Sequence, residues 1–268
     1  MKERLERKYD DLRRSIGAMG KVAVTFSGGV DSTLLLKVCV DVLGSANVLA
    51  LTGVSPIHPR DEREEARALA AELGVRMVAF DSAEMEDESF LANGLERCYH
   101  CKTHLFKSVR EIARQEGYSL VLEGSNVDDM NDFRPGRKAC VEQGVKSPLL
   151  EADLNKEEVR TLSRELGLKT HDKPAEACLS TRIPYGTPIT VGRLRDIERA
   201  EAFIKALGIS RVRVRHHGSA ARIEVEEKDL PLIIEQRNPI AGELTDIGFT
   251  YVALDLRGYR TGSMNEGQ

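Results

Sequence analysis

The stretch that most constrains the fold of this chain is KVAVTFSGGVDSTLLLK, at residues 21–37. A short apolar run ends there in two adjacent glycines, and an acid followed by hydroxyl residues opens a second apolar segment. Glycine has no Cβ, so the backbone N–H groups of such a turn can close around an anion. A helix that starts at the turn adds a partial positive charge. The stretch therefore predicts a buried strand, an anion-binding turn and a helix in direct succession.

The candidates for binding a phosphorylated ligand in this turn are Ser27, Gly28, Gly29, Asp31 and Ser32. The serine hydroxyls can donate hydrogen bonds to phosphate, whereas the carboxylate of Asp31 would be repelled by a bare phosphate. A magnesium ion between the two removes that conflict, so Asp31 is also the expected metal ligand. The turn lacks the G-x-x-x-x-G-K-[ST] signature of kinase and GTPase P-loops. An ordinary glycine-rich turn capped by Asp31 is the competing interpretation, but it does not require this whole set of residues.

Short apolar strands and helices alternate through the first part of the chain. The strands are expected at residues 22–26, 48–51, 77–80 and 120–122, and the helices at 2–19, 32–43, 60–73, 103–116 and 156–166. Uniformly apolar strands that alternate with helices predict a parallel sheet with helices on both faces. The anion-binding turn would then lie at the carboxyl edge of the sheet, where open α/β folds bind ligands.

The pattern changes near residues 184–192. A helix is expected at 194–207, an alternating hairpin at 211–226, another helix at 228–236 and a last strand at 251–258. Such an order predicts a smaller α+β domain. The expected organisation is therefore an α/β domain over residues 1–186 and an α+β domain over residues 187–268.

Composition excludes several classes of protein. The net charge of −4 gives no overall basic field for nonspecific binding of nucleic acid. The N-terminal sequence MKERLERKYDDLRRS is too charged for a signal peptide, and no apolar run has the length of a membrane span. The cytoplasm is the expected location, with no membrane partner. In that compartment, cysteines indicate free thiols, a metal site or catalysis rather than disulfides.

Three of the cysteines are candidate ligands of a metal or cluster: Cys98 and Cys101, in the motif RCYHCK, and Cys178. Together they can hold three irons of a [4Fe–4S] cluster and leave the fourth iron open to another ligand. Zinc is the alternative, with His100 and His104 completing a tetrahedral set. A further alternative is a pair of unligated thiols at the start of a helix.

The two remaining cysteines carry no such pattern. Cys39 lies on the apolar face of an expected helix, which predicts a core residue. Cys140 follows RPGRKA, and no role is assigned to it.

The segment SGGVDS resembles the S-G-G-x-D-S signature of the PP-loop ATP pyrophosphatases. NAD synthetase, GMP synthetase and tRNA-thiolating enzymes are members of that superfamily. The resemblance implies that ATP is split between its α and β phosphates, that a substrate is adenylated, and that pyrophosphate is released. It also implies a PP-loop fold for the expected parallel-sheet domain.

Five segments extend the resemblance over nearly the whole chain: VTFSGGVDSTLLLK, MNDFRPGRKA, ACLSTRIPYGTPIT, RVRVRHHGSAARIEV and YVALDLRGYRTGSMN. Together they resemble the LarE sulfur transferases, which act in maturation of the nickel-pincer nucleotide cofactor of lactate racemase. The resemblance implies that ATP adenylates a carboxylate of pyridinium-3,5-biscarboxylate mononucleotide. A protein-bound sulfur then displaces AMP and leaves a thiocarboxylate. A homo-oligomeric assembly is implied as well.

Two sulfur routes occur in that family. In one, a single cysteine gives up its sulfur and becomes dehydroalanine. In the other, three cysteines hold a [4Fe–4S] cluster that carries an extra sulfide. Because this sequence has Cys98 and Cys101 as well as Cys178, it resembles the cluster type. These cysteines and Asp31 are the residues to which the resemblance gives catalytic roles.

Arginines alternate along the expected hairpin. Arg211, Arg213 and Arg215 would lie on one strand face and could clamp a phosphate. A cross-strand ladder of ion pairs with Glu224 and Glu226 explains the same pattern. The residues alone leave both open, and the resemblance favours Arg213 and Arg215 as ligands of the substrate phosphate.

The other expected substrate contacts are Ser180, Arg182, Glu201, Asp132 and Arg134. Glu201 falls within the apolar arc of its helix, where a carboxylate needs a partner. Arg182 is alternatively an anchor for its loop. The acids near Asp132 can bind magnesium or hold Arg134, and turn or capping chemistry is the alternative.

Two other functions fit parts of the pattern. A tRNA-thiolating enzyme also combines a PP-loop with cysteines, but it predicts a basic RNA-binding domain. A non-catalytic ATP-binding protein with structural zinc would bind ATP and release no pyrophosphate. ATP, Mg²⁺ and a [4Fe–4S] cluster are the expected cofactors, and a nicotinate-derived mononucleotide is the expected small-molecule partner.

Overall fold

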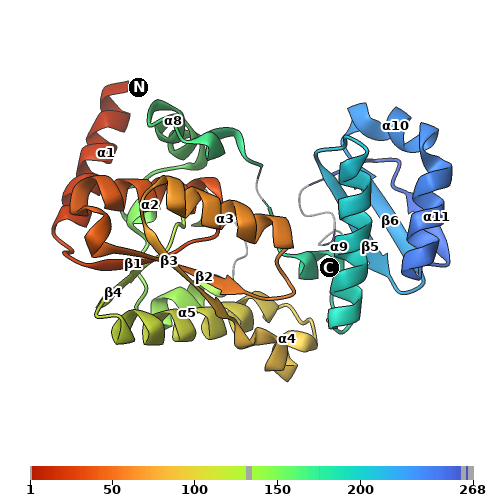
Figure 1. The fold of residues 1–268 in the computed structure, drawn as a ribbon, viewed down its shortest axis with the longest axis horizontal. Helices are drawn as coiled ribbons and strands as arrows, with labels where there is room; N and C mark the ends of the chain where they lie inside the picture. Colours follow the sequence, from red (N-terminus) through yellow and green to blue (C-terminus); the bar gives the residue numbers. More distant parts are fainter. Residues whose placement is uncertain (1, 131–134, 175, 261–263, 265–268) are drawn as a thin grey trace. The chain divides into compact units, whose positions relative to one another are not determined.

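The computed structural model describes residues 2–130, 135–174, 176–260 and 264 (Figure 1). Within these ranges the chain forms a parallel four-stranded sheet and a separate three-stranded sheet, which confirms the α/β class with a smaller α+β part. None of the helices in the described part is long and apolar enough to cross a membrane.

The chain packs as two compact units. The first contains residues 1–90 and 96–176, and the second contains 91–95 and 177–268. The short segment 91–95 groups with the second unit because the Asn93 side chain donates hydrogen bonds to the carbonyls of Pro184 (2.8 Å) and Thr187 (2.9 Å). The expected domains 1–186 and 187–268 describe a division of function and stay a prediction.

The sheet of the first unit has the strand order β3-β2-β1-β4, and all neighbouring strands are parallel. The strands are β1 (Val22–Thr25), β2 (Val48–Val54), β3 (Arg76–Asp81) and β4 (Leu120–Leu122). β1 therefore lies inside the sheet with a partner on each side. All of its register partners, such as Leu49 and Val121 beside Ala23, are apolar, which explains the continuous hydrophobic run in the sequence.

Helices cover both faces of this sheet (Figure 1). They are α1 (Lys2–Gly17), α2 (Val30–Leu43), α3 (Arg60–Glu72), α4 (Glu88–Leu91), α5 (Arg97–Gln115), α6 (Gly136–Glu142), α7 (Pro148–Glu151) and α8 (Lys156–Glu165). Val22 and Val24 belong to a core with α1, α2, α3 and α8. Ala23, between them, belongs to a second core with α5 and α6. Alternate side chains of β1 therefore pack into two separate cores, one on each face of the sheet.

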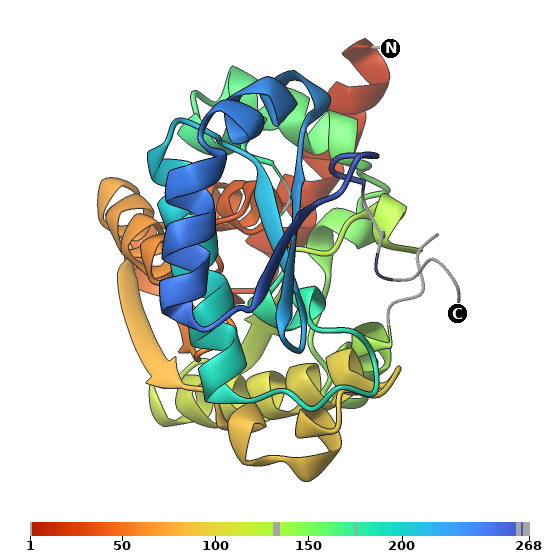
Figure 2. The same ribbon diagram turned by 90° about the vertical axis from the view of Figure 1, so that its right-hand side faces the viewer.

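The second unit has a sheet in the order β5-β6-β7, seen in light and dark blue in Figure 2. Its elements are α9 (Val191–Ala206), β5 (Val212–His217), β6 (Ala220–Val225), α10 (Leu230–Glu235), α11 (Arg237–Ile247) and β7 (Tyr251–Leu254). β5 and β6 are antiparallel, as the hairpin pattern predicts, whereas β7 joins β6 in parallel. The core of this unit is formed by α9, α11 and the inward face of the sheet, with residues such as Ile204, Val214, Ile223 and Leu244.

Short 3₁₀ helices connect the main elements: η1 (Ser45–Asn47), η2 (Ala83–Glu86), η3 (Val127–Met130), η4 (Lys169–Asp172), η5 (Leu179–Arg182) and η6 (Glu227–Asp229). Two of them matter below. η3 follows β4 at the carboxyl edge of the first sheet, and η5 directly follows Cys178 in the second unit.

The structure differs from the sequence expectation at several helices: α4, α6, α7 and α11 were not expected, and α5 begins earlier. α5 begins at Arg97 rather than near Thr103, so Cys98 and Cys101 lie within the first turns of the helix. α11 was not expected, because Pro239 and Gly242 interrupt its pattern. Proline is tolerated there because it lies in the first turn, where backbone N–H groups have no partner within the helix.

Candidate active site

The SGGVDS turn joins β1 to α2 as the sequence predicts. Gly28 has a left-handed φ of +72°, and Gly29 is the N-cap of α2. A Cβ on Gly28 would lie 3.2 Å from both Cα and Cβ of Ala66 in α3. Both the backbone angle and the close approach of α3 therefore favour glycine at this position.

Hydroxyl groups tie the turn to the first turn of α2. The Oγ atoms of Ser27 and Ser32 lie 3.1 Å apart, and Ser32 Oγ donates to the carbonyl of Gly29 at 3.2 Å. The strand side is fixed as well, because Thr52 of β2 donates to the Phe26 carbonyl at 2.7 Å. The backbone N–H groups at the start of α2 are thus held in place for an anion.

A second glycine supports this arrangement from β4. A Cβ on Gly124 would lie 3.0 Å from the backbone nitrogen of Ser32 and 3.1 Å from the carbonyl carbon of Asp31. The chain after β4 therefore passes directly against the start of α2. This approach brings the segment that follows, including Asn126, to the side chain of Asp31.

Asp31 has two partners that the sequence analysis missed. Asn126 Nδ2 donates to Oδ1 of Asp31 at 3.0 Å, and Lys156 Nζ lies 2.5 Å from Oδ2. Lys156 is the first residue of α8, and its backbone N–H donates to Asp128 at 2.8 Å. A cation therefore already lies beside Asp31. The capping box at Asn155 was the one sequence signal near Lys156, since it sets the start of α8.

Magnesium fits Asp31 as a site that is completed by the ligand. In proteins Mg²⁺ is bound through one or two carboxylates, substrate phosphates and water. Among the described residues there is no group of three acidic, histidine or cysteine side chains that would enclose a metal. Asp31 is partly exposed, with 23% of its side-chain surface accessible, and the Ser27 and Ser32 hydroxyls lie in the same turn. The Asp31 carboxylate and the two serine hydroxyls therefore match a magnesium ion whose other ligands are nucleotide phosphates and water.

The acids after β4 serve turns and caps among the described residues. Asp129 accepts from the backbone of Asn126 at 3.0 Å, and Asp128 caps α8 through Lys156. The capping alternative thus accounts for these two acids. The expected site residues Asp132 and Arg134 lie outside the described residues.

Cys98 and Cys101 lie on α5 in the first unit, and both are partly exposed. His104 Nε2 is 2.9 Å from Oδ2 of Asp87, and His100 Nδ1 is 3.6 Å from the same oxygen. Burial acts to raise the pKa of Asp87, but hydrogen bonds, with His104 first, outweigh it and hold this pKa below its usual range. Both histidines face Asp87 with one ring nitrogen, so in the zinc alternative each would bind the metal through its other ring nitrogen.

The other two cysteines of the first unit are buried. Burial raises the pKa of the Cys39 thiol to about 12, which matches its expected place in the core. The pKa of Cys140 is also raised, first by burial and then by the nearby carboxylate of Glu123. Its Sγ lies 3.4 Å from the carbonyl of Val145. Neither residue is available as a thiolate near neutral pH.

Cys178 begins the η5 turn of the second unit. Its Sγ lies 2.9 Å from Oγ of Ser180, which is 1% exposed. Arg182, at the end of the turn, forms a buried ion pair with Glu201 of α9: Nε–Oε1 is 2.9 Å and Nη2–Oε2 is 3.1 Å. The sequence expectation that Glu201 needs a partner is met by this pair. Ser180 therefore contacts the thiol of Cys178, and Arg182, which is held by Glu201, donates to the Cys178 carbonyl at 3.0 Å.

The arginines of the hairpin form the cross-strand ladder that the sequence left open. Arg211 pairs with Glu226 at 3.1 Å, and Arg215 pairs with Glu224 at 2.6 Å. Arg213 makes a different set of contacts. Its Nη1 donates to the Val212 carbonyl at 2.8 Å, and its guanidinium lies 5.6 Å from the centre of the Tyr259 ring.

Comparison with known proteins identifies the family. The family model described as NAD synthase matches residues 5–98, which include the SGGVDS turn. An uncharacterized protein of Synechocystis sp. is 42% identical over 265 residues, covering 97% of this chain and 98% of the relative. The pyridinium-3,5-bisthiocarboxylic acid mononucleotide synthase of Lactiplantibacillus plantarum is 38% identical over 262 residues, covering 98% and 95%. The chain belongs to the LarE family.

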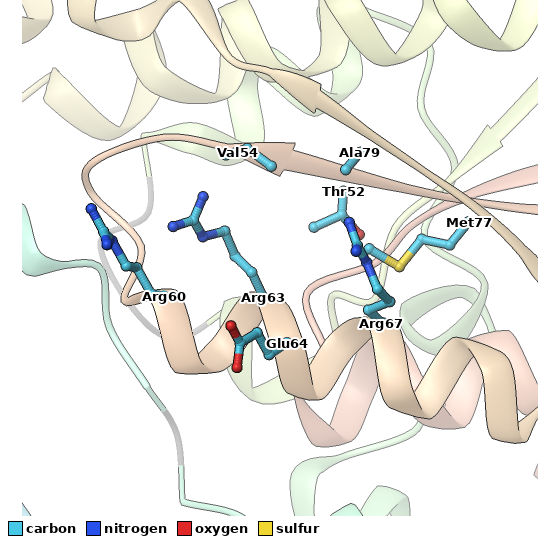
Figure 3. A pocket seen from close by; sticks show the side chains of 8 residues that line it. All are labelled: Thr52, Val54, Arg60, Arg63, Glu64, Arg67, Met77 and Ala79. Carbon is cyan, nitrogen blue, oxygen red and sulfur yellow. The ribbon is translucent and has the colours of Figure 1, made fainter.

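In this LarE family member the SGGVDS turn lies next to a cavity of about 350 Å³ (Figure 3). The cavity lies between α3 and the strands β2 and β3. Arginine side chains rise from α3 on one side, and small or apolar residues of the strands form the other. The lining residues are Thr52, Val54, Arg60, Arg63, Glu64, Arg67, Met77 and Ala79.

Two contacts connect this cavity to the PP-loop of the LarE fold. Thr52 holds the carbonyl of Phe26, and Ala66 of α3 packs against Gly28. Nε of Arg63 is buried without a hydrogen-bond partner among the described residues. A buried donor of this kind favours a ligand that offers an acceptor. No sequence signal pointed to the cavity, because its lining comes from three separate elements.

Proposed function

We propose that this protein is an ATP-dependent sulfur transferase acting on pyridinium-3,5-biscarboxylate mononucleotide. ATP would adenylate one carboxylate of the substrate, and sulfur would then replace AMP to give the thiocarboxylate. The observation that carries the proposal is the SGGVDS turn, with left-handed Gly28 and α2 capped by Gly29. It occurs in a chain that is 38% identical, over nearly its whole length, to a synthase of the bisthiocarboxylic acid mononucleotide.

In the adenylation step, a carboxylate oxygen of the substrate attacks the α-phosphorus of ATP. The bond from that phosphorus to the bridging oxygen breaks, and pyrophosphate leaves. Ser27, Gly28, Gly29 and Ser32 would hold the phosphates through hydroxyl and backbone donors. Asp31 would bind Mg²⁺, which when bound neutralises phosphate charge and polarises the phosphoryl oxygens. Lys156 lies beside Asp31 and would add its charge to the phosphates.

We assign the nucleoside part of ATP to the cavity beside α3. Two facts support this assignment: its volume of about 350 Å³ falls in the range of small-molecule sites, and Thr52 and Ala66 join its walls to the PP-loop. Arginine guanidiniums stack readily on planar aromatic rings, so α3 offers a surface for a base. Filling the cavity with Val54→Trp should raise KM for ATP without changing the reactivity of Cys178.

Cys98, Cys101 and Cys178 are proposed to hold a [4Fe–4S] cluster, which when bound would supply the transferred sulfide. The family resemblance supports this three-cysteine set; all three thiols are partly exposed, and Cys98 and Cys101 lie one turn apart at the start of α5. The new carbon–sulfur bond forms as the bond from the acyl carbon to the AMP oxygen breaks. The alternative route, in which Cys178 alone gives up its sulfur, would leave dehydroalanine at this position.

The phosphate and carboxylates of the substrate need cationic partners. The family resemblance supports Ser180, Arg182, Glu201, Arg213, Arg215, Asp132 and Arg134 as the substrate-binding set. Of these, Arg213 and Arg215 are the two that the family resemblance assigns to the substrate phosphate. Cytoplasmic location and homo-oligomeric assembly remain parts of the proposal that cell fractionation and light scattering would test.

The test combines product analysis with metal analysis after anaerobic purification. The protein is incubated with ATP, Mg²⁺ and the biscarboxylate mononucleotide, and pyrophosphate, AMP and the thiocarboxylate are measured. Iron, sulfide and zinc are assayed in the wild type, in Cys98→Ala and in the matched control Cys140→Ala. We expect about four irons per chain in the wild type and in the control, and loss of iron in Cys98→Ala.

Other outcomes separate the alternatives. Pyrophosphate release that does not depend on the mononucleotide would contradict the proposed substrate. Zinc in place of iron would favour a structural site. A protein without metal that still makes thiocarboxylate, with dehydroalanine at Cys178, would support the single-cysteine route.

A further inference from the structure

The short segment 91–95, which leads to Cys98, is fastened to the chain that follows Cys178 through the buried side chain of Asn93. We infer that Asn93 is a positioning residue that keeps Cys98 and Cys101 within reach of Cys178. It acts through the backbone, because its segment belongs to the second unit while the chain on both sides of it belongs to the first. This inference rests on the proposed function, in which the three cysteines take part in one sulfur transfer.

The amide of Asn93 is fully buried and is directed at backbone carbonyls. Its nitrogen lies 2.8 Å from the carbonyl oxygen of Pro184, 2.9 Å from that of Thr187 and 3.3 Å from that of Ile183. An amide group has two N–H donors, so the two shorter contacts use both of them. The backbone carbonyl of Asn93 also accepts from the N–H of Gly186, at 3.0 Å. Both the side chain and the main chain of Asn93 therefore hold the same short stretch.

That stretch is a tight turn. The Thr187 N–H donates to the Pro184 carbonyl at 3.0 Å, and Gly186 has the left-handed φ, +77°, that the third residue of a type II turn requires. Just after the turn, the N–H of Ile189 donates to the carbonyl of Leu91 at 2.8 Å, and Ile189 is 2% exposed. The segment 91–95 is thus bonded at two places to the chain that enters α9.

Asparagine meets two requirements at position 93 that other residues meet only in part. The backbone there has a left-handed φ of +56°, which asparagine tolerates better than most residues. Glycine would accept this backbone but has no amide to donate. Aspartate has nearly the same shape, but it would place carboxylate oxygens against the three carbonyl oxygens. The residue type therefore fits a role in holding the turn.

The connections between the two units show what this bonding achieves. The chain passes from one unit to the other between residues 90 and 91, between 95 and 96, and between 176 and 177. The first two of these crossings depend on the bonds of Asn93. Cys98 follows Asn93 by five residues, so the chain allows at most about 18 Å between their Cα atoms. If Asn93 let go, only the crossing before Cys178 would join the units.

The test measures the effective concentration of two thiols in the full-length chain, freed of metal and carrying Cys98→Ala, so that Cys101 and Cys178 form a single pair. The protein is equilibrated in glutathione redox buffers, and the Cys101–Cys178 disulfide is quantified by mass spectrometry. Asn93→Asp is compared with Asn47→Asp in this background. Asn47 is a matched control, because its amide also donates to a backbone carbonyl, at 2.8 Å, within the first unit.

We expect Asn93→Asp to lower the effective concentration at least about tenfold, because one crossing in place of three restrains the two thiols. Asn47→Asp should leave it within about twofold. In the chain with all its cysteines, Asn93→Asp should slow sulfur transfer and keep KM for ATP within about twofold, since the PP-loop lies in the first unit. An unchanged effective concentration in folded Asn93→Asp would overturn the inference. So would a chain with Asn93 intact in which Cys101 and Cys178 form no disulfide.

A milder variant keeps the test decisive if Asn93→Asp does not fold. Asn93→Gly keeps the left-handed backbone without strain and removes only the amide. It should lower the effective concentration in the same direction and by less. A lower free energy of unfolding with an unchanged effective concentration would show a purely structural role and would overturn the inference.

The inference and the proposed function can fail separately. Absence of thiocarboxylate formation by the wild type would refute the proposed function. The disulfide measurement needs neither ATP nor the mononucleotide, so it would still decide whether Asn93 keeps Cys101 within reach of Cys178.

Discussion

The PP-loop turn of the first unit and the Cys178 turn of the second differ in what holds them and in how exposed their charged side chains are. The shape of the PP-loop turn is set by the backbone of Gly28 and Gly29, and its charged residue Asp31 is partly exposed. The Cys178 turn is held instead by the ion pair of Arg182 and Glu201, whose side chains are both nearly inaccessible. The carboxylate of Asp31 is thus accessible to a ligand, whereas the ion pair of Arg182 and Glu201 is enclosed by protein.

Substitutions in the two turns should therefore affect stability and function differently. A Cβ on a left-handed glycine costs about 1–2 kcal/mol and alters the shape of the anion site, so function should suffer more than stability. Removing one member of a buried ion pair leaves an uncompensated charge and costs about 3–5 kcal/mol. Stability and function should therefore fall together in the Cys178 turn.

The largest effect is expected for Glu201→Ala. It leaves the guanidinium of Arg182 buried without its carboxylate and removes the acceptor of the Val214 N–H. The free energy of unfolding of the second unit should fall by about 3–5 kcal/mol, measured by urea unfolding. The matched control is Glu226→Ala, which removes an ion pair to Arg211 whose side chains are 33% and 30% accessible, and which should cost far less. Equal losses in the two variants would contradict the distinction drawn between buried and exposed pairs.

Asp31→Asn should affect catalysis rather than folding. The amide keeps the shape of the side chain and can still accept from Asn126, but it loses the charge that would bind Mg²⁺ and that faces Lys156. The rate of pyrophosphate release should fall about 100- to 1,000-fold, and the free energy of unfolding should change little. Asp41→Asn is the control on the same helix, since Asp41 pairs with Lys37 at 2.5 Å away from the turn. Full activity in Asp31→Asn would remove Asp31 from the proposed metal site.

Gly28→Ala tests whether the PP-loop turn depends on backbone shape. The substitution should cost about 1–2 kcal/mol for the left-handed backbone, and its Cβ would also press on Ala66. Gly44→Ala is the matched control, because Gly44 has a φ of +78° at the other end of α2 and nothing within 4 Å of its Cβ. Gly28→Ala should lose somewhat more stability than Gly44→Ala because of the contact with Ala66, and only Gly28→Ala should raise KM for ATP, by about tenfold. A similar KM in the two variants would show that α3 does not constrain the turn.

The same contrast explains how much of the molecule could be predicted from its sequence. The strand, the turn and α2 follow from neighbouring residues, and so do the parallel sheet and the β5–β6 hairpin. The partners of Asp31 could not be predicted, because Asn126 and Lys156 reach it from the ends of β4 and α8. Topology, rather than any local pattern, brings these ends to one edge of the sheet.

The arginine pattern of the hairpin shows the same limit. Alternation predicts that Arg213 and Arg215 share a face, but it cannot choose between an ion-pair ladder and a phosphate clamp. The choice depends on Thr181 and Glu224, which come from η5 and β6. The sequence therefore indicates which residues matter, and packing decides what each of them does.

Acid pH should lower the stability of the first unit gradually, through His58. Burial first, then Lys102 and Arg63, lower the pKa of His58 in the loop after β2 from its usual 6.5 to about 4. As pH falls below 6.5, the unfolded chain binds this proton before the folded chain does, so stability decreases until about pH 4 and then levels off. The loss is at most about 1.4 kcal/mol per pH unit.

His58→Gln should reduce the pH dependence of the free energy of unfolding of the first unit, measured by urea unfolding between pH 7 and pH 5. Arg63→Gln, which removes one of the two cations, should reduce the dependence only in part. A slope of the wild-type size remaining in His58→Gln would mean that other groups carry the acid sensitivity.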